Sequence, residues 1–438
     1  MSRRRETYHK LLLGGLFAVL FLPLIQEHLH LKKVYPLNGD VTLPPDIEFD
    51  KEDWFSGYYQ EEKEKFINSD FGFRNQFVKL NNQIAYSLYH KAKANGVVIG
   101  KETYLYEQSY INAYTGTDFL GKDSIDHTIG RMKFVSDTLR KLGKQLIVVF
   151  AAGKASFYPE YIPDEYLPVR GPTNYGYMSV AAQQAGLHVI DFNRWFIANK
   201  YRSKYPLYPQ HGIHWSTYGT ALAADSLLRK IEELRGIDVP ELKFDGVNME
   251  QAHGVDYDIG DGMNLLFHLK SFDMAYPQML HVDAKGKTKP RVLVISDSFY
   301  WGMFNLGIRN CFDNSHFWYY NRQVYPESEK QDLLVDDVDL GEALAAHDVF
   351  VVMATEATLR KISWGFLENA ERYYKGFRVP KPDAEAKEYE QKVKDMVKYI
   401  KGNEQWLSDT KKRARERGIS TDSMLLLEAR WNLDHQGK

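Results

Sequence analysis

The stretch Val292-Leu-Val-Ile-Ser-Asp-Ser298-Phe decides how this chain folds. Its first four residues form a continuous apolar run rich in β-branched side chains, which is typical of a parallel strand buried on both faces. A polar Ser-Asp-Ser turn follows, and the aromatic segment after it can begin a helix. Ligands collect at the carboxyl ends of the strands in an open parallel sheet. We therefore expect Ser298 to lie at a ligand-binding edge.

Other segments repeat this pattern of strand, turn and helix. Apolar runs typical of buried strands occupy residues 146–151, 188–190 and 349–353, and helical patterns occupy residues 123–142, 175–185 and 216–234. This alternation predicts an α/β domain with a mainly parallel sheet flanked by helices. Residues 97–106 are predicted to form a hairpin.

A second motif, His211-Gly-Ile-His214-Trp-Ser-Thr-Tyr-Gly219, lies upstream. Ser216 is a predicted N-cap, which would hold His214 just outside the start of a helix. A serine and a histidine that folding brings together are the minimum for nucleophilic acyl chemistry. Taken singly, each has a simpler explanation, because Ser298 also fits an N-cap and His214 a packed or capping histidine.

Together the two motifs resemble those of the AlgJ/AlgX-like family of alginate O-acetyltransferase proteins, which have SGNH-hydrolase-like catalytic domains. Three further segments are similar to family segments, and the resemblance spans residues 50–370. These segments are Phe71-Gly-Phe-Arg74, Ile99-Gly-Lys-Glu-Thr-Tyr-Leu-Tyr106 and Lys154-Ala-Ser-Phe-Tyr158-Pro-Glu160.

The resemblance implies a function. Ser298 would be the nucleophile and His214 the general base of an enzyme that moves acetyl groups onto exopolysaccharide in the periplasm. Family members usually act beside a membrane-bound O-acyltransferase that supplies acetyl, and the reaction needs no metal or organic cofactor. Four residues in or near the motifs are expected to contact the substrate: Lys154, Tyr158, Thr355 and Trp215.

The acid that should orient His214 is missing from its usual place. The family's Asp two residues before the histidine is Gly212 here, and the Asp that ordinary SGNH enzymes have three residues before it is His211. Glu356, at the end of a neighbouring strand, is the preferred substitute. Asp297 ranks lower, because adjacent side chains on a tight turn diverge. The other carboxylates considered are Asp191 at a strand end and Asp256 and Asp258 in a loop. If no acid is near, Gly212→Asp is expected to raise turnover.

The N-terminus indicates export. Ser2-Arg3-Arg4-Arg5 precedes an uncharged apolar run at residues 11–25, with no small-x-small cleavage site after it. These features predict an uncleaved signal anchor in the inner membrane. The positive-inside rule places its N-terminus inside the cell, with the bulk of the chain in the periplasm. A cleaved signal peptide is the alternative.

Domain boundaries follow changes in composition. Residues 1–31 are the predicted anchor, 32–50 a linker, 51–380 the SGNH-hydrolase-like domain and 381–438 a helical appendage. In the appendage, apolar residues recur at helical spacing, but the repeat is too short for a coiled coil.

Composition limits the classes of molecule that this chain is expected to bind. A net charge of −2 over 438 residues gives no indication of nucleic-acid binding. The single cysteine, Cys311, excludes an intramolecular disulfide. The 29 Tyr, 24 Phe and 8 Trp fit either a large core or sugar stacking. The expected partners are a polysaccharide and an acetyl donor. The alternatives to a transferase are a non-catalytic polysaccharide-binding subunit and a carbohydrate acetylesterase.

Overall fold

The computed structural model describes residues 2–29, 33, 35–39, 44–69, 71–167, 169–377, 384–417 and 421–435. Its central feature is a six-stranded sheet with the order β4-β3-β10-β7-β8-β9. The strands are β3 (Gln145–Ala151), β4 (His188–Asp191), β7 (Val292–Ser296), β8 (His316–Tyr319), β9 (Gln323–Tyr325) and β10 (Val349–Thr355). The first five strands in this order pair in parallel, and β9 pairs antiparallel with β8.

The sheet is covered on both faces, which explains its continuous apolar strands. Alternate residues of β3, β7 and β10 enter two separate cores, so that Val149 and Val294 face one core while Val148 and Ile295 face the other. One core includes residues of α9 (Phe192–Asn199), α10 (Thr217–Arg235) and α12 (Phe299–Asn305). The other includes residues of α6 (Lys122–Lys141), α8 (Asn174–Gln184), α13 (Leu340–Ala346) and α14 (Phe366–Tyr374).

Two antiparallel pairs lie outside the central sheet. The predicted hairpin is present as β1 (Val97–Ile99) and β2 (Leu105–Glu107). A longer pair, β5 (Glu241–Glu250) and β6 (Met274–Asp283), encloses a loop that carries α11 (Asp258–Gly262). The α/β class is as expected, but the described strands are not all parallel: β9 makes the central sheet mixed, and the two outlying pairs are antiparallel sheets of their own. The short helices α5 (Gln108–Thr115) and α7 (Lys154–Phe157) complete this part of the chain.

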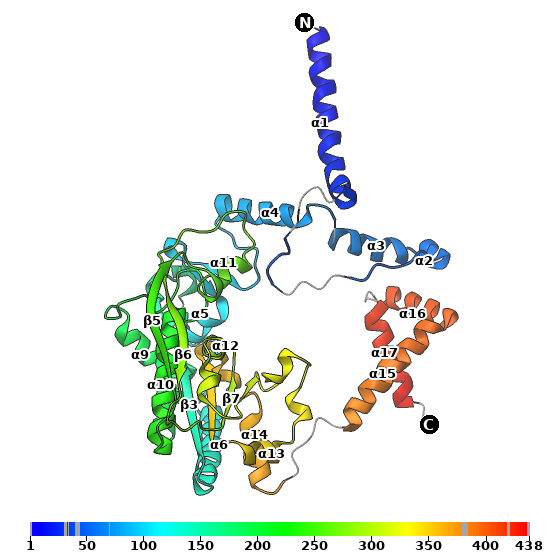
Figure 1. The fold of residues 1–438 in the computed structure, drawn as a ribbon. Coiled ribbons are helices and arrows are strands. Elements are labelled where there is room, and N and C mark those ends of the chain that lie inside the picture. The colour runs from blue at the N-terminus through cyan, green and yellow to red at the C-terminus, as the bar shows by residue number, and fades with distance from the viewer. Residues whose placement is uncertain are drawn as a thin grey trace.

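A long helix, α1 (Ser2–Leu29), projects from the rest of the structure (Figure 1). Its segment Thr7–Leu29 is long and apolar enough to cross a membrane, and none of that segment's apolar window is buried. The expected apolar run at residues 11–25 lies within it. Signal sequences pass the same test of length and composition, so the helix is either an anchor or a signal. After it come α2 (Lys51–Ser56), α3 (Tyr58–Ser69) and α4 (Arg74–Tyr89).

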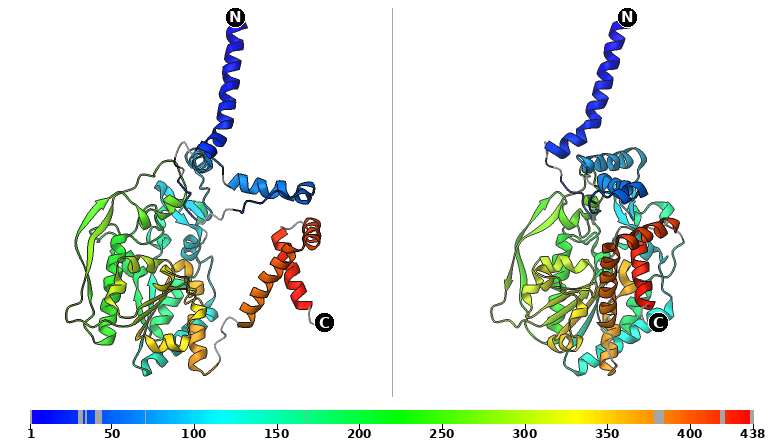
Figure 2. Two further views of the ribbon diagram at one scale, coloured as in Figure 1. Left: turned by 45° about the vertical axis from the view of Figure 1, so that its right-hand side comes forward. Right: turned by 90° about the vertical axis from the view of Figure 1, so that its right-hand side faces the viewer.

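The C-terminal part contains α15 (Ala384–Gly402), α16 (Glu404–Glu416) and α17 (Thr421–His435), drawn in orange and red in Figure 2. The three helices share a small core of their own around Val393, Ile400, Leu425 and Ala429. Lys411 of α16 pairs with Asp53 of α2. The predicted helical spacing of this segment therefore produces packed helices.

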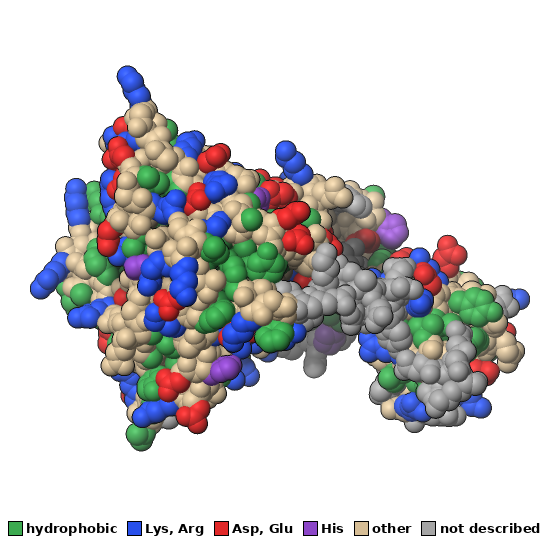
Figure 3. All heavy atoms as spheres, turned by 90° about the horizontal axis from the view of Figure 1, so that it is seen from below, with side chains coloured by type: hydrophobic (Ala, Val, Ile, Leu, Met, Phe, Trp, Pro, Cys, Tyr) green, Lys and Arg blue, Asp and Glu red, His purple; other side chains and the backbone are tan. Residues whose placement is uncertain are grey.

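Charged side chains of both signs are interspersed on the face seen from below (Figure 3). This distribution agrees with the small formal net charge of −2. The face drawn there offers no surface of a single charge that would attract a polyanion such as nucleic acid.

Candidate active site

Ser298 lies where the sequence predicts, directly after β7 and at the start of α12. Its side chain makes no capping hydrogen bond to the helix, so the simpler explanation as an N-cap does not account for it. The turn is fixed instead by Asp297, whose Oδ1 accepts a hydrogen bond from the Phe299 N–H at 3.1 Å. Asp297 Oδ2 also accepts one from the Thr355 N–H, at the end of β10, at 2.9 Å. The turn therefore directs the Ser298 hydroxyl away from these supports.

His214 comes from the loop before α10 and meets this serine. Its Nε2 lies 2.9 Å from Ser298 Oγ, within hydrogen-bonding distance. Ser216 is the N-cap of α10, as expected, and accepts a hydrogen bond from the Gly219 N–H at 2.9 Å. The ring of His214 also packs against that of Phe299, with the centroids 4.7 Å apart. The loop and the start of α12 thus hold the imidazole against the serine.

The third member of the group is Asp258, at the start of α11. Its Oδ2 lies 2.5 Å from His214 Nδ1. Its Oδ1 accepts hydrogen bonds from the Ile213 N–H at 2.8 Å and the Ile259 N–H at 2.7 Å. A carboxylate held in this way fixes the orientation of the ring and favours the tautomer that leaves Nε2 free to accept a proton from Ser298.

Gly212 explains why the acid is not at the family's usual position. A Cβ at this residue would lie 2.5 Å from the backbone oxygen of Val255 and 3.0 Å from the carbonyl carbon of Asp256. The loop that delivers Asp258 therefore occupies the space that a carboxylate side chain at this position would need. The condition for the expected gain from Gly212→Asp, that no acid lies near His214, is therefore not met.

The two carboxylates that were preferred from sequence have other partners. Glu356 is buried, with its Oε2 accepting a hydrogen bond from Ser156 Oγ at 2.6 Å and its Oε1 one from Asn193 Nδ2. It therefore ties together the segments after β10, β3 and β4 rather than contacting His214. Asp297 bonds to the start of α12 and the end of β10, as described above. Both expectations for the acid are corrected in favour of Asp258, which the sequence offered only as a loop alternative.

The four residues expected to bind substrate are buried and are not among the residues that line the cavity over Ser298. Lys154 is fully buried, and its Nζ donates to the carbonyls of Gln210 at 2.8 Å and Gly212 at 2.6 Å, so it holds the loop that carries His214. Trp215 is buried under the same loop, and Tyr158 donates a hydrogen bond to the Tyr208 carbonyl at 3.2 Å. Thr355 is buried against Asp297.

A cavity of about 480 Å³ opens over Ser298, His214 and Asp258. The other residues that line it come mainly from the hairpin region, α5, α11 and the loops after β8 and β10. They are Ala94, Asn95, Val97, Glu107, Ser109, Tyr110, Ile213, Ile259, Gly262, Tyr320, Ala357 and Thr358. Sequence reasoning missed Glu107, Ser109, Tyr320 and Thr358, because polar residues in loops carry no signal of which cavity they will line.

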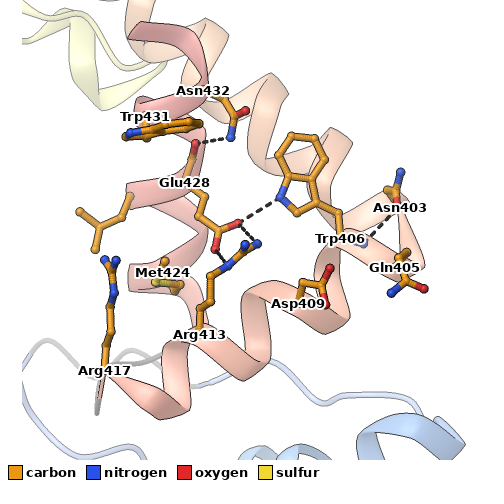
Figure 4. Close-up of a pocket in the computed structure, with 11 residues that line it drawn as sticks. Asn403, Gln405, Trp406, Asp409, Arg413, Arg417, Met424, Glu428, Trp431 and Asn432 are labelled. Carbon is orange, nitrogen blue, oxygen red and sulfur yellow. Dashed lines mark hydrogen bonds and ion pairs between the residues drawn. The ribbon is translucent and has the colours of Figure 1, made fainter. Parts of the chain in front are cut away.

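A larger cavity of about 770 Å³ lies between α16 and α17, where Figure 4 shows Glu428 bonded to both Trp406 and Arg413. Its polar groups bond mainly to one another. Glu428 accepts hydrogen bonds from Trp406 Nε1 at 3.1 Å and from Arg413 Nε at 2.7 Å. The described residues that line it include no serine, cysteine or histidine. The smaller cavity, which contains Ser298 and His214, is therefore the candidate active site.

The surroundings of His214 shift its pKa in the direction that suits proton transfer. Burial lowers the pKa of His214, but the hydrogen bond and negative charge of Asp258, helped by Asp297 and Glu107, more than offset this, and the pKa is raised above 6.5. His211, the neighbouring histidine in the motif, behaves differently. Burial lowers its pKa to about 3, so it stays neutral and cannot serve as a charged partner.

The loop that carries the acid is itself anchored by Asp256. This carboxyl group is buried and accepts hydrogen bonds from the Thr217 N–H at 3.1 Å and Thr217 Oγ1 at 2.8 Å, at the start of α10. Burial raises the pKa of Asp256 to about 6. The segment 256–258 thus supplies one acid that fixes α10 and another that holds His214.

Comparison with known proteins agrees with this part of the fold. Residues 97–265 match the family described as "SGNH hydrolase-like domain, acetyltransferase AlgX". The matched range includes His214 and Asp258 and ends before Ser298. "Probable alginate O-acetylase AlgJ" of Pseudomonas putida is 24% identical over 136 residues, which are 31% of this chain and 34% of that protein. The chain therefore matches about a third of the length of this relative.

Two solved structures are also similar. One is the O-acetyltransferase domain of Pseudomonas putida AlgJ, with 15% identity and a TM-score of 0.42, covering 64% of this chain and 99% of that one. The other is Pseudomonas aeruginosa AlgX, with 13% identity and a TM-score of 0.35, covering 59% and 55%. The family match confirms the resemblance expected from the motifs: residues 97–265 of this chain are similar to the SGNH hydrolase-like domain of the AlgJ/AlgX-like acetyltransferase family.

Proposed function

We propose that this protein is an O-acetyltransferase that moves acetyl groups onto an exported or cell-surface polysaccharide through an acetyl-serine intermediate. The observation that carries the proposal is the continuous hydrogen-bonded arrangement of Ser298, His214 and Asp258. Nucleophile, base and orienting acid stand in the order that acyl transfer requires. The family match supports the same class of reaction.

In the first half-reaction, Ser298 Oγ attacks the carbonyl carbon of an acetyl donor while His214 Nε2 takes the hydroxyl proton. Asp258 stabilises the imidazolium that forms and keeps Nδ1–H directed at its own carboxylate. Backbone N–H groups beside Ser298 stabilise the negative charge on the carbonyl oxygen. The bond to the donor then breaks, its leaving group takes the proton from His214, and acetyl stays on Ser298.

In the second half-reaction, a sugar hydroxyl attacks the acetyl carbonyl and gives its proton to His214 Nε2. The bond from Ser298 Oγ to the acetyl group breaks, and His214 returns the proton to the serine. One acetyl group has then moved from donor to sugar with no net change in protons on the enzyme. All of the proton transfers use groups of this chain.

The cellular setting is part of the proposal. α1 would anchor the protein in the inner membrane, with the arginines at positions 3–5 inside the cell and the bulk of the chain in the periplasm. A membrane-bound O-acyltransferase would supply acetyl from the other side. The raised pKa of His214 fits a base that works near neutral pH.

Two assays test this function. Release of p-nitrophenol from p-nitrophenyl acetate, lost in Ser298→Ala, would separate an enzyme from a polysaccharide-binding subunit. Mass analysis of an added oligosaccharide would then separate a transferase from an esterase, because water is the acceptor in an esterase and the sugar gains no acetyl group. Ester turnover that Ser298→Ala leaves unchanged would contradict the proposal.

A further inference from the structure

The cavity over Ser298 is acidic. Two of its lining residues, Glu107 and Asp258, carry carboxyl groups, and no lysine or arginine is among the described residues that line it. The two carboxyl groups interact electrostatically: the pKa of Glu107 is raised first by burial and then by the charge of Asp258. A ligand in this cavity therefore lies beside a second carboxyl group, that of Glu107, in addition to the Asp258 carboxylate that pairs with His214.

The nearest ammonium group does not reverse this charge. Lys154 interacts electrostatically with Asp258 and Glu107, but it is fully buried and lies behind the loop that carries His214. Its Nζ is held by the carbonyls of Gln210 and Gly212. Burial also lowers its pKa to about 7, so its positive charge is only partly present at neutral pH. Lys154 cannot offer a hydrogen bond or an ion pair to a ligand.

The rest of the lining suits uncharged hydroxyl groups. Asn95, Ser109 and Thr358 provide amide and hydroxyl groups, and Tyr110 and Tyr320 provide aromatic rings. Ser109 is exposed, so its hydroxyl is accessible. Amides, hydroxyls and aromatic faces recognise sugar rings without needing a charge on them.

Building on the proposed function, we infer that the acceptor is a polysaccharide whose sugars carry no acidic group: a neutral polymer or one with amino sugars. In a polyuronate, every ring carries a carboxylate, so the ring that presents its hydroxyl to Ser298 would bring a negative charge into the cavity with Glu107 and Asp258. Juxtaposed like charges in a partly desolvated site cost several kcal/mol when no cation compensates them. The alginate named for the relatives is such a polyuronate, so this chain would differ from them in its acceptor.

Glu107 is then a specificity-determining residue. Unlike Asp258, it makes no hydrogen bond with His214 among those of the described residues, so its charge can be changed while the catalytic group is retained. Glu107→Gln removes the charge at nearly constant volume, and Glu107→Arg reverses it. Glu342→Gln, an exposed carboxylate on α13 far along the chain, is the matched control.

The experiment compares three acceptors of equal length: cellopentaose, a glucosamine pentamer and a mannuronate pentamer. Acetyl transfer to each from p-nitrophenyl acetate gives kcat/KM, and the cellopentaose to mannuronate ratio is the measure of selectivity. The wild type is expected to prefer both non-acidic acceptors by at least about ten-fold, given the cost of like charges. Glu107→Gln should reduce the ratio, Glu107→Arg should reduce it further, and Glu342→Gln should leave it unchanged. Added salt should also reduce the wild-type preference.

Failure of this inference is distinguishable from failure of the proposed function. If the wild type releases p-nitrophenol but acetylates the mannuronate pentamer as well as or better than the other two, only the acceptor inference is overturned. If there is no turnover, binding of the three pentamers to Ser298→Ala by calorimetry still gives the preference. In that case too, the inference is overturned if the mannuronate pentamer binds as tightly as cellopentaose or more tightly. It is also overturned if Glu107→Arg leaves the cellopentaose to mannuronate ratio of affinities unchanged.

Discussion

Asp258 Oδ2 lies 2.5 Å from His214 Nδ1, although the two residues are 44 positions apart in the sequence. In the resembling family the orienting acid precedes the histidine by two residues. Here that position is Gly212, whose missing Cβ leaves room for the backbone at Val255 that leads to Asp258. The absence of an acid at position 212 and the presence of Asp258 beside His214 therefore have one structural basis, the path of the loop that passes Gly212.

Replacing Asp258 tests the role of the acid. Asp258→Asn is expected to lower kcat for p-nitrophenyl acetate by about four orders of magnitude, because an amide favours the wrong tautomer of the histidine. Circular dichroism checks that the fold persists. Glu356→Gln is the comparison, since Glu356 bonds to Ser156 and Asn193. A larger loss of kcat in Glu356→Gln than in Asp258→Asn would return the acid role to Glu356.

Gly212 should not tolerate a side chain. Gly212→Asp and Gly212→Ala are expected to lower ester turnover and to reduce the free energy of unfolding by about 1–3 kcal/mol, the usual cost of overpacking. Gly130→Ala, in an exposed turn of α6 with nothing within 4 Å of the added Cβ, is the control and should be neutral or stabilising. Denaturant unfolding and initial rates measure both effects. Higher turnover in Gly212→Asp would show that Asp258 does not fill the role.

The pH dependence should report His214. The base must be neutral to accept the serine proton, and its pKa is raised above 6.5 chiefly by Asp258 acting against burial. Consequently kcat/KM should rise with pH through a midpoint above 6.5. In Asp258→Asn the residual activity should have a lower midpoint, because the raising charge is gone while the burial remains. An identical midpoint in both proteins would be inconsistent with the pairing of Asp258 and His214.

The N-terminal helix is predicted to remain on the mature protein. The motive is the arginine-rich flank at positions 3–5 and the absence of a small-x-small site after residue 25. N-terminal sequencing of protein recovered from the membrane fraction provides the measurement. A mature start between residues 26 and 40 would instead identify a cleaved secretory signal.

Local patterns were enough to predict most of the fold. Continuous apolar runs identified β3, β7 and β10, because strands covered on both faces have no polar side. Helical spacing and stop signals located α6, α8 and α10 to within about two residues, the usual uncertainty of such boundaries. The pair of β5 and β6 was missed, since the residues of β5 are half-buried or exposed without regular alternation and lack the apolar signature. The central sheet is mixed through β9, whose antiparallel pairing with β8 was also not predicted.

The site was predictable only for residues that stand in short motifs of consecutive residues. Ser298 and His214 stand in recognisable motifs, and the structure brings them together. Asp258 had one signal, its place in the Asp-rich segment 256–261, but pairing with His214 depends on how the loop between β5 and β6 folds back. Lys154 and Glu356 look functional in sequence because charged residues at strand ends often are. Both are buried, which sequence does not report, and neither lines the cavity over Ser298.

The most direct test of the account is to locate the acetyl group on the enzyme. Protein mixed briefly with p-nitrophenyl acetate, quenched in acid and digested, is mapped by tandem mass spectrometry. We predict acetyl on Ser298 of the wild type and none at this position in Ser298→Ala, whose p-nitrophenol release should also be lost although its stability falls by at most about 1 kcal/mol. Acetyl on another residue with Ser298 unmodified, or full turnover by Ser298→Ala, would contradict the account.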